Sequence, residues 1–303
     1  MDTPWGALPV TDAHIHFFSR HFFAGLAEQK KLTIEALEPL LGWPMPPEDP
    51  VQLADTWVQQ LERFGVSRAV LIASVPGDHN SVIAAVAQHP QRFWGYMMVN
   101  PAAPNAEAYV ERALATGHMH GLCFFPAMHR YSIQDDRAAK ILDLAAAKPG
   151  TIVFVHCGVL SVGVRKKLGL PSQFDMRFSN PIDLHAVALR YPRLRFVVPH
   201  FGAGYLREAL MLCDLCPNVY LDTSSSNSWM RYEEAHLDLR TVFRRALDVA
   251  GPKRLLFGTD SSFFPRGWNV AIFEAQTKAL YEIGVNAETA RAIFHDNLPQ
   301  LFS

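Results

Sequence analysis

The chain has 303 residues, of which 49% are apolar and 19% are charged, and its formal net charge is −1. A net charge this close to zero gives no electrostatic reason to expect a nucleic-acid partner or an anionic membrane surface. Four cysteines in so long a chain are no disulfide framework, so we expect a reduced, cytoplasmic protein. The opening residues MDTPWGALPV have no basic segment and no long apolar run, and we therefore expect no signal peptide.

Short apolar segments alternate with amphipathic segments along the whole chain. The apolar segments are rich in Val, Ile, Leu and Phe, which predicts strands buried on both faces of a parallel sheet. We predict these strands at residues 8–17, 67–74, 92–100, 120–126, 151–157, 194–200, 218–224 and 253–260. The amphipathic segments predict helices at residues 51–65, 80–90, 105–117, 135–147, 183–192, 205–217, 237–251, 269–284 and 286–302.

Eight strands that are each followed by a helix predict an α/β fold, a single-domain (β/α)8 TIM barrel over residues 1–303. The alternative is an open doubly wound sheet, which needs a Gly-rich phosphate turn after its first strand, and none is present here. Three connections are long, and all three follow strands; they cover residues 18–50, 158–182 and 225–236. We expect them on the carboxyl-terminal face of the barrel, where active sites lie.

Thirteen histidines are the unusual feature of the composition. Imidazole and carboxylate side chains end four of the predicted strands; they are Asp12, His14 and His16 on the first, His156 on the fifth, His200 on the sixth and Asp260 on the eighth. Alternate residues of a strand point the same way, so we expect the three on the first strand to share a face. Imidazole with carboxylate is a ligand set for zinc, iron or manganese. The pattern predicts a metal site at the mouth of the barrel.

Four segments carry a resemblance to a known family: Asp-Ala-His-Ile-His-Phe (12–17), Val-His-Cys-Gly (155–158), Pro-His-Phe-Gly (199–202) and Phe-Gly-Thr-Asp-Ser-Ser-Phe (257–263). They resemble the amidohydrolase superfamily, in particular the branch that includes aminocarboxymuconate-semialdehyde decarboxylase and the resorcylate-type decarboxylases. The resemblance implies that one divalent ion, Zn²⁺ first and Mn²⁺ or Fe²⁺ as alternatives, is bound by His14, His16, His156 and Asp260. It also implies that His200 and Asp260 are catalytic and handle the proton of a metal-activated water.

One position departs from the two-metal members of that superfamily. In those proteins a carboxylated Lys on the fourth strand bridges two metals, whereas Cys123 fills the matching position here. We therefore expect one metal, and Cys123 as a small buried residue, with a role as an extra soft ligand left open. A second His-x-His, His118 to His120, lies at the start of the fourth strand, at the end of the barrel where residues serve stability.

Candidate substrate contacts lie in the long loops; they are Phe18, Asn227, Arg266 and Trp268. An Arg at the mouth could clamp a carboxylate, and an aromatic side chain could form a stacking wall. Our leading hypothesis is a mononuclear hydrolase of an ester, lactone or amide bond in a small carboxylated or aromatic molecule. The alternatives are a metal-dependent non-oxidative decarboxylase of an aromatic or muconate-type acid, a non-haem iron oxygenase, and a barrel kept for binding. The expected partner is a small-molecule substrate, with neither nucleic acid nor membrane, and pairing through outer helices would give a homodimer.

Overall fold

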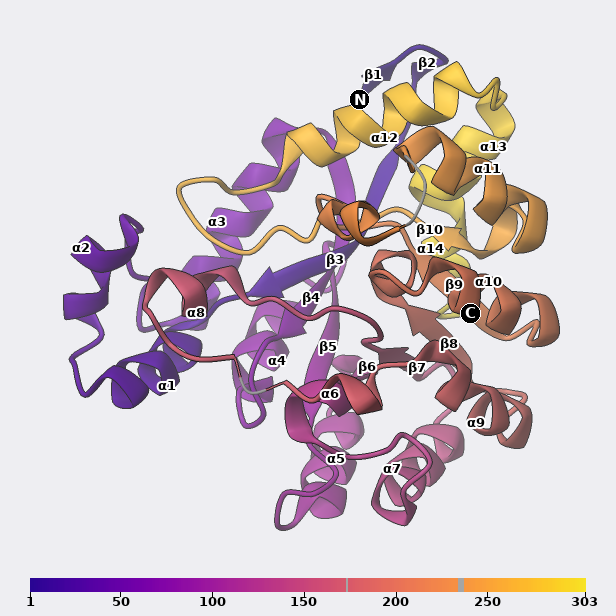
Figure 1. The fold of residues 1–303 in the computed structure, drawn as a ribbon. Helices are drawn as coiled ribbons and strands as arrows, with labels where there is room; N and C mark the ends of the chain where they lie inside the picture. Colours follow the sequence, from indigo (N-terminus) through magenta and orange to yellow (C-terminus); the bar gives the residue numbers. More distant parts are fainter. Residues whose placement is uncertain (173, 234–236) are drawn as a thin grey trace.

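The computed structural model describes residues 1–172, 174–233 and 237–303, and its centre is one parallel sheet of eight strands (Figure 1). Neighbours in the sheet follow the order of the chain. The strands are β3 (Val10–Phe17), β4 (Val66–Ala73), β5 (Phe93–Val99), β6 (Met119–Phe124), β7 (Ile152–Val155), β8 (Arg195–Val198), β9 (Val219–Asp222) and β10 (Leu255–Leu256). Each overlaps one of the predicted strands, which confirms the barrel.

The first strand, β3, and the segment that follows β10 close the barrel through backbone hydrogen bonds at the predicted metal site. The His16 N–H donates to Ser261 O at 2.8 Å, and the Asp260 N–H donates to His14 O at 3.0 Å. Asp260 has a φ of 57°, so regular strand geometry ends before it. The strand β10 already ends at Leu256, where the sequence predicts a strand over 253–260, because the N–H groups of Phe257 and Thr259 donate to Ile293 O and Asp12 Oδ1 instead of to a neighbouring strand.

One helix of six to fourteen residues covers the barrel after each strand, in chain order. These helices are α3 (Pro50–Arg63), α4 (His79–Gln88), α5 (Ala106–Ala115), α7 (Asp136–Ala147), α9 (His185–Arg190), α10 (Leu206–Leu215), α11 (Leu239–Val249) and α12 (Val270–Glu282). The start of α3 illustrates the local cause: Asp49 caps the helix by accepting from the Val51 N–H at 2.9 Å, and Pro50 occupies its first turn. The predicted helix over 286–302 is instead α13 (Ala287–Arg291), a π-helical turn and α14 (Asn297–Gln300).

The connections after β3, β6 and β7 hold further helices that the sequence pattern does not predict. They are α1 (Arg20–Lys30), α2 (Glu38–Leu41), α6 (Pro126–His129) and α8 (Gly163–Lys167). Helices α1, α2 and α8 gather beside the barrel (Figure 1), around an apolar cluster that includes Phe23, Leu26, Trp43 and Val164. The predicted connections 158–182 and 225–236 each include positions outside the described residues, 173 and 234–236.

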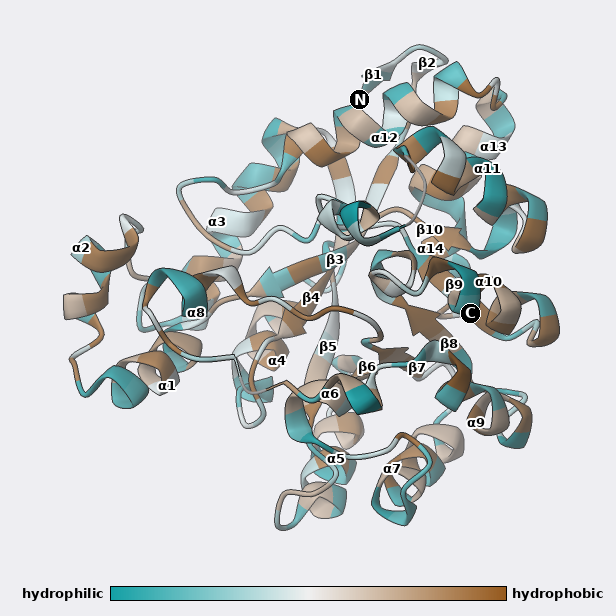
Figure 2. Cartoon of the chain, viewed as in Figure 1, coloured by the Kyte–Doolittle hydropathy of each residue, from teal (hydrophilic) through white to brown (hydrophobic). Residues whose placement is uncertain are grey.

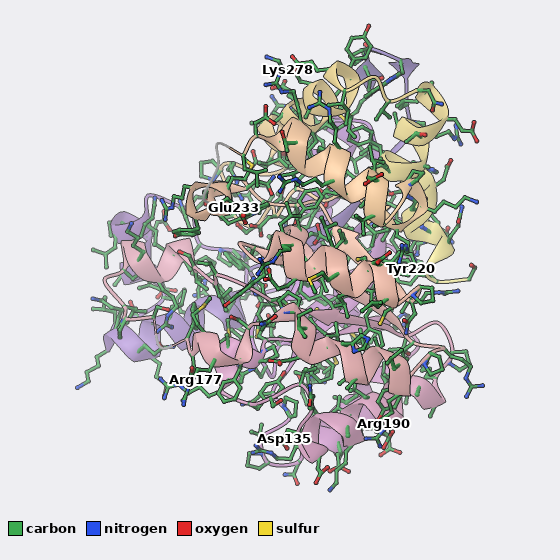
Figure 3. All side chains as sticks on the ribbon, turned by 45° about the vertical axis from the view of Figure 1, so that its right-hand side comes forward. Asp135, Arg177, Arg190, Tyr220, Glu233 and Lys278 are labelled. Atoms are coloured by element: carbon green, nitrogen blue, oxygen red, sulfur yellow. The ribbon has the colours of Figure 1, made fainter. Side chains whose placement is uncertain are left out.

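Apolar residues are concentrated on the strands, and polar residues are common on the outer helices (Figure 2). Charged side chains such as Arg177, Arg190 and Lys278 lie at the periphery (Figure 3). At the amino-terminal end of the barrel, Phe302 stacks on Trp94 with ring centroids 4.7 Å apart. None of the helices in the described ranges is both long enough and apolar enough to cross a membrane.

Candidate metal centre

Three of the predicted ligands converge where β3 meets the turn after β10. His14 Nε2 lies 3.3 Å from His16 Nε2. Asp260 Oδ1 lies 3.3 Å from His16 Nε2 and 3.7 Å from His14 Nε2. Among the described residues, these three side chains form the group of potential metal ligands whose donor atoms lie within 4.8 Å of one another.

Hydrogen-bond partners fix where the protons of the two imidazoles sit. His14 Nδ1 lies 2.6 Å from Asp222 Oδ2, and because an ionised carboxylate only accepts, Nδ1 carries the proton. His16 Nδ1 lies 2.8 Å from Ser74 Oγ, whose own hydrogen goes to a backbone carbonyl at 3.0 Å, so this Nδ1 is also a donor. In the neutral rings, both Nε2 lone pairs therefore face each other and Asp260.

This arrangement fits a divalent cation. When both rings are neutral, three acceptor atoms face one another at 3.3 to 3.7 Å with no hydrogen between them, which is repulsive unless a positive charge lies at their centre. Ligand atoms about 2.1 Å from a common tetrahedral zinc lie about 3.4 Å apart, close to the spacing of His14, His16 and Asp260. The donor set of two imidazoles and one carboxylate suits zinc, manganese or iron.

His156, the fourth predicted ligand, lies in the same cavity but outside that group of three. Its ring lies edge-on to that of His200, with centroids 5.4 Å apart, and stacks on Phe125 at 5.3 Å. Its Nδ1 is buried and has no hydrogen-bond partner, a state that costs about 1–3 kcal/mol unless a ligand satisfies it. Burial, together with the neighbouring imidazoles of His200 and His14, lowers the pKa of His156, which keeps the ring neutral as a metal ligand must be.

His200 follows β8 on a turn with unusual backbone geometry. His200 and Phe201 have φ values of 56° and 54°, conformations that cost energy and that cluster at functional sites. The ring stacks on His14 at 5.0 Å, and its Nδ1 lies 2.9 Å from Ser224 Oγ. Burial lowers the pKa of His200, so the neutral form is favoured and Nε2 is left available.

The glycine of the Val-His-Cys-Gly segment is needed to pack this turn. Gly158 has a φ of 76°, and a Cβ there would lie 2.1 Å from Gly202 O and 2.4 Å from Ala203 O. The Val159 N–H donates to Ala203 O at 2.8 Å. Only a residue without a side chain lets the loop after β7 lie this close to the His200 turn.

Electrostatics keeps the two site carboxylates ionised. Burial raises the pKa of Asp260, but the neighbouring imidazoles of His16, His14 and His200 outweigh burial and hold it below its usual value. The same competition lowers the pKa of Asp222, where His14 provides the opposing charge and hydrogen bond. Ionised Asp260 is the form that binds a cation.

Asp12 differs from the prediction that it shares a face with His14 and His16. The register between β3 and β4 shifts after Asp12, which turns its side chain away from the cavity. The buried carboxylate accepts from the His14 N–H at 2.9 Å and from Trp268 Nε1 at 2.7 Å. Burial raises the pKa of Asp12 to about 6. Its contacts anchor the backbone of the site rather than the reacting groups.

The site opens into a cavity of about 490 Å³ with an aromatic and cationic lining. The aromatic side chains of this lining are Phe18, Phe22, Trp43, Phe125, Trp229, Tyr232 and Phe263. Its cationic side chains are Lys167, Arg231 and Arg266, and Asp260 is the one carboxylate among the described residues that line it. The cavity is therefore suited to a flat molecule that carries negative charge.

Of the four predicted substrate contacts, the structure places two in this lining. Phe18 stacks on Phe22 with centroids 3.9 Å apart, and Arg266 Nη2 donates to Asp260 O at 3.2 Å. Trp268 is buried at the Asp12 carboxylate, and Asn227 accepts from Trp229 Nε1 at 3.1 Å; neither lines the cavity.

Three polar residues of the site were not among the candidates from sequence: Ser74, Asp222 and Ser224. All three lie at or just beyond the carboxyl ends of β4 and β9, so the strand-end rule that selects Asp260 could have found them. Cys123 is fully buried inside the barrel and does not line the cavity.

Comparisons with known proteins agree with this geometry. The family model for amidohydrolases matches residues 11–299. Protein fluG of Emericella nidulans is 34% identical over 87 residues, which are 29% of this chain and 10% of that protein, so the chain matches only about a tenth of that relative's length.

Two solved structures share the fold over nearly the whole chain. A probable 2-pyrone-4,6-dicarboxylic acid hydrolase from Acinetobacter baumannii, with citric acid bound, is 15% identical with a TM-score of 0.62, and the match covers 97% of this chain and 99% of that one. A 5-carboxyvanillate decarboxylase from Novosphingobium aromaticivorans, with bound manganese and a nitrobenzoic acid, is 14% identical with a TM-score of 0.63, and the match covers 98% and 97%.

Proposed function

This chain belongs to the amidohydrolase family, and we propose on that premise that it is a mononuclear metal-dependent hydrolase. Its substrate would be a small, carboxylated or aromatic molecule with an ester, lactone or amide bond. The observation that carries the proposal is the inward-facing set of His14 Nε2, His16 Nε2 and Asp260 Oδ1, spaced 3.3 to 3.7 Å apart.

The metal would be held by His14, His16 and Asp260, with His156 as a fourth donor from the same cavity. When bound, such an ion lowers the pKa of a coordinated water toward about 7 and polarises a substrate carbonyl. His200, with its Nδ1–H directed to Ser224, offers an unprotonated Nε2 that can take up a proton from the attacking water. As the imidazolium, the same residue can then stabilise negative charge on the substrate or return the proton to the leaving group.

The lining of the cavity supports a carboxylated substrate. The cavity lining includes three cationic side chains, Lys167, Arg231 and Arg266. Asp260 is the one carboxylate among the described lining residues, and a bound metal would offset the negative charge of Asp260. Arg266 lies next to Asp260 and over the ring of Phe263, with its guanidinium carbon 4.5 Å from the centroid. It is thus held in place to form two parallel hydrogen bonds to a carboxylate.

The test is ring opening of 2-pyrone-4,6-dicarboxylate and a panel of related lactones, esters and amides by protein loaded with Zn²⁺ or Mn²⁺. We expect each substrate molecule that is consumed to release one new acid group. In His200→Gln we expect kcat to fall by about 10²–10⁴-fold. Carbon dioxide release without net acid formation would contradict hydrolysis. Full metal content in His156→Ala would remove His156 from the ligand set.

The same cavity also favours a second reaction, non-oxidative decarboxylation of an aromatic acid. The specific observation is the cationic mouth, since Arg266 beside Asp260 could hold the carboxylate that is lost. The structural similarity to a 5-carboxyvanillate decarboxylase is compatible with this reaction. Measuring carbon dioxide from 5-carboxyvanillate, and ¹⁸O uptake from labelled water into the product, separates the two, because hydrolysis incorporates the label and decarboxylation does not.

A further inference from the structure

The carboxyl end of β9 carries two buried polar residues that contact the site histidines from behind, Asp222 and Ser224. We propose that they are positioning residues. Asp222 fixes His14 for metal binding, and the Ser224 hydroxyl ties His14 and His200 together so that both rings carry their proton on Nδ1. The role of Asp222 in metal binding rests on the proposed function. The role of Ser224 concerns only the position of the histidine protons and does not depend on a metal.

Both oxygens of Asp222 are engaged. Oδ2 lies 2.6 Å from His14 Nδ1, and Oδ1 accepts from the Ser224 N–H at 2.7 Å. A carboxylate held at both oxygens cannot rotate, so it fixes the plane of the His14 ring. The negative charge behind the ring also makes Nε2 a better donor to a cation, which is how a carboxylate behind a metal-bound histidine acts.

Ser224 connects the two rings. Its Oγ lies 3.0 Å from His14 Nδ1 and 2.9 Å from His200 Nδ1. A hydroxyl oxygen has two lone pairs, so it can accept the His200 Nδ1–H and also share the His14 Nδ1–H, whose shorter contact is to Asp222 Oδ2. The backbone carbonyl of Ser224 adds a second acceptor for His200 Nδ1 at 3.3 Å. The tautomer with Nε2 free is therefore favoured in both rings.

A glycine just beyond the end of β10 supports the same assignment. A Cβ at Gly258 would lie 2.9 Å from Asp222 Oδ1 and 3.0 Å from both His14 Cβ and Ser224 Cβ. Its φ lies outside the positive range, so the backbone conformation does not require glycine. The space that Gly258 leaves open is the space these three residues occupy.

The chain offers a matched control between the two positioning residues. Thr223 is as deeply buried, but its side chain points to the opposite side, with Oγ1 2.7 Å from Gln276 Oε1. Thr223→Val removes a buried hydroxyl from the same strand end without touching a histidine. A purely structural role for this segment would give Asp222 and Thr223 variants the same phenotype.

The first experiment measures Zn²⁺ affinity by competition with a chromogenic chelator. We expect about 10–100-fold weaker binding in Asp222→Ala, a smaller loss in Asp222→Asn, and a change within about twofold in Thr223→Val. Gly258→Ala, which displaces the same carboxylate, should weaken binding in the same direction as Asp222→Asn and covers the case in which Asp222→Ala fails to fold. Wild-type affinity in Asp222→Asn and Gly258→Ala would overturn the role of Asp222.

The second experiment uses metal-free protein, so it remains informative if the wild type binds no Zn²⁺ and the proposed function fails. The ¹⁵N shifts of the His200 ring report which nitrogen carries the proton. We expect the Nδ1–H tautomer in the wild type and in Thr223→Val, and a mixture with Nε2–H in Ser224→Ala. An unchanged His200 tautomer in Ser224→Ala would overturn the role of the hydroxyl.

Discussion

Gly158→Ala tests whether the close approach of two loops builds the His200 turn. The added Cβ would lie 2.1 Å from Gly202 O, a distance at which the backbone must move. The loop is also tied by the hydrogen bonds from the Gly158 N–H to Ser179 O and from the Val159 N–H to Ala203 O, both 2.8 Å long. Any shift that relieves the overlap therefore strains these bonds.

The magnitude follows from two costs. A φ of 76° is outside the range that alanine adopts freely, which costs about 1–2 kcal/mol. Overpacking against a fixed backbone adds about 1–3 kcal/mol. Together they lower the free energy of unfolding by about 2–5 kcal/mol, a large share of the roughly 5–15 kcal/mol of a typical domain.

Urea unfolding measures this loss, and Gly25→Ala is the matched control. Gly25 lies inside α1 without a positive φ, and a Cβ there would meet no atom within 4 Å, so alanine should stabilise by about 0.5–1 kcal/mol. We expect a lower midpoint and an unchanged slope for Gly158→Ala. If the free energy of unfolding of Gly158→Ala lies within about 0.5 kcal/mol of the wild type, the range of ordinary surface substitutions, then the two loops do not require glycine at this position.

Three further outcomes follow from the structure. Trp268→Phe removes the donor to Asp12 Oδ2 and should lower the free energy of unfolding, measured in urea, by about 1–3 kcal/mol. We expect no change in KM. A rise in KM without a loss of stability would show that Trp268 contacts the substrate. Burial lowers the pKa of His120 to about 4, and the Gly95 N–H donates to its Nδ1. Between pH 6.5 and 4 the His120 side chain therefore takes up a proton in the unfolded chain but not in the folded chain. The free energy of unfolding falls as the pH drops through that window. His120→Asn keeps a hydrogen-bond acceptor and should make this loss of stability smaller by about 1–2 kcal/mol, a figure reduced for the partial exposure of the ring. An equally steep loss of stability in the variant would exclude His120 as its source. Removing the metal with a chelator should lower the free energy of unfolding by about 2.7 kcal/mol when the free metal concentration is about a hundred times its Kd. Asp260→Asn should abolish this effect. An equal chelator effect in that variant would show that the metal binds at a different site.

The barrel and most of the site follow from the sequence because both depend on local signals. Strands buried on two faces have a continuous apolar pattern, and the carboxyl ends of parallel strands meet on one face of a barrel. These two rules place His14, His16, His156, His200 and Asp260 in one cavity, as the structure does.

The parts that could not be predicted depend on contacts between distant segments. Helices α1 and α8 are stabilised by an apolar cluster that joins residues such as Phe22 and Val164, far apart in the chain. Asp12 turns away because of a register shift that leaves no mark in the alternating pattern. Trp268 follows Asp260 closely in sequence, but its indole N–H is used by a buried carboxylate on β3.

If His14, His16 and Asp260 hold a catalytic metal, the metal content per chain depends on these side chains. Protein purified without chelators should contain one divalent ion per chain, and His16→Ala should contain little or none. The matched control is His120→Ala, which breaks the other His-x-His of the chain, at the opposite end of the barrel, and should keep the metal. Equal metal content in His16→Ala and the wild type would show that His16 is not a ligand of the metal.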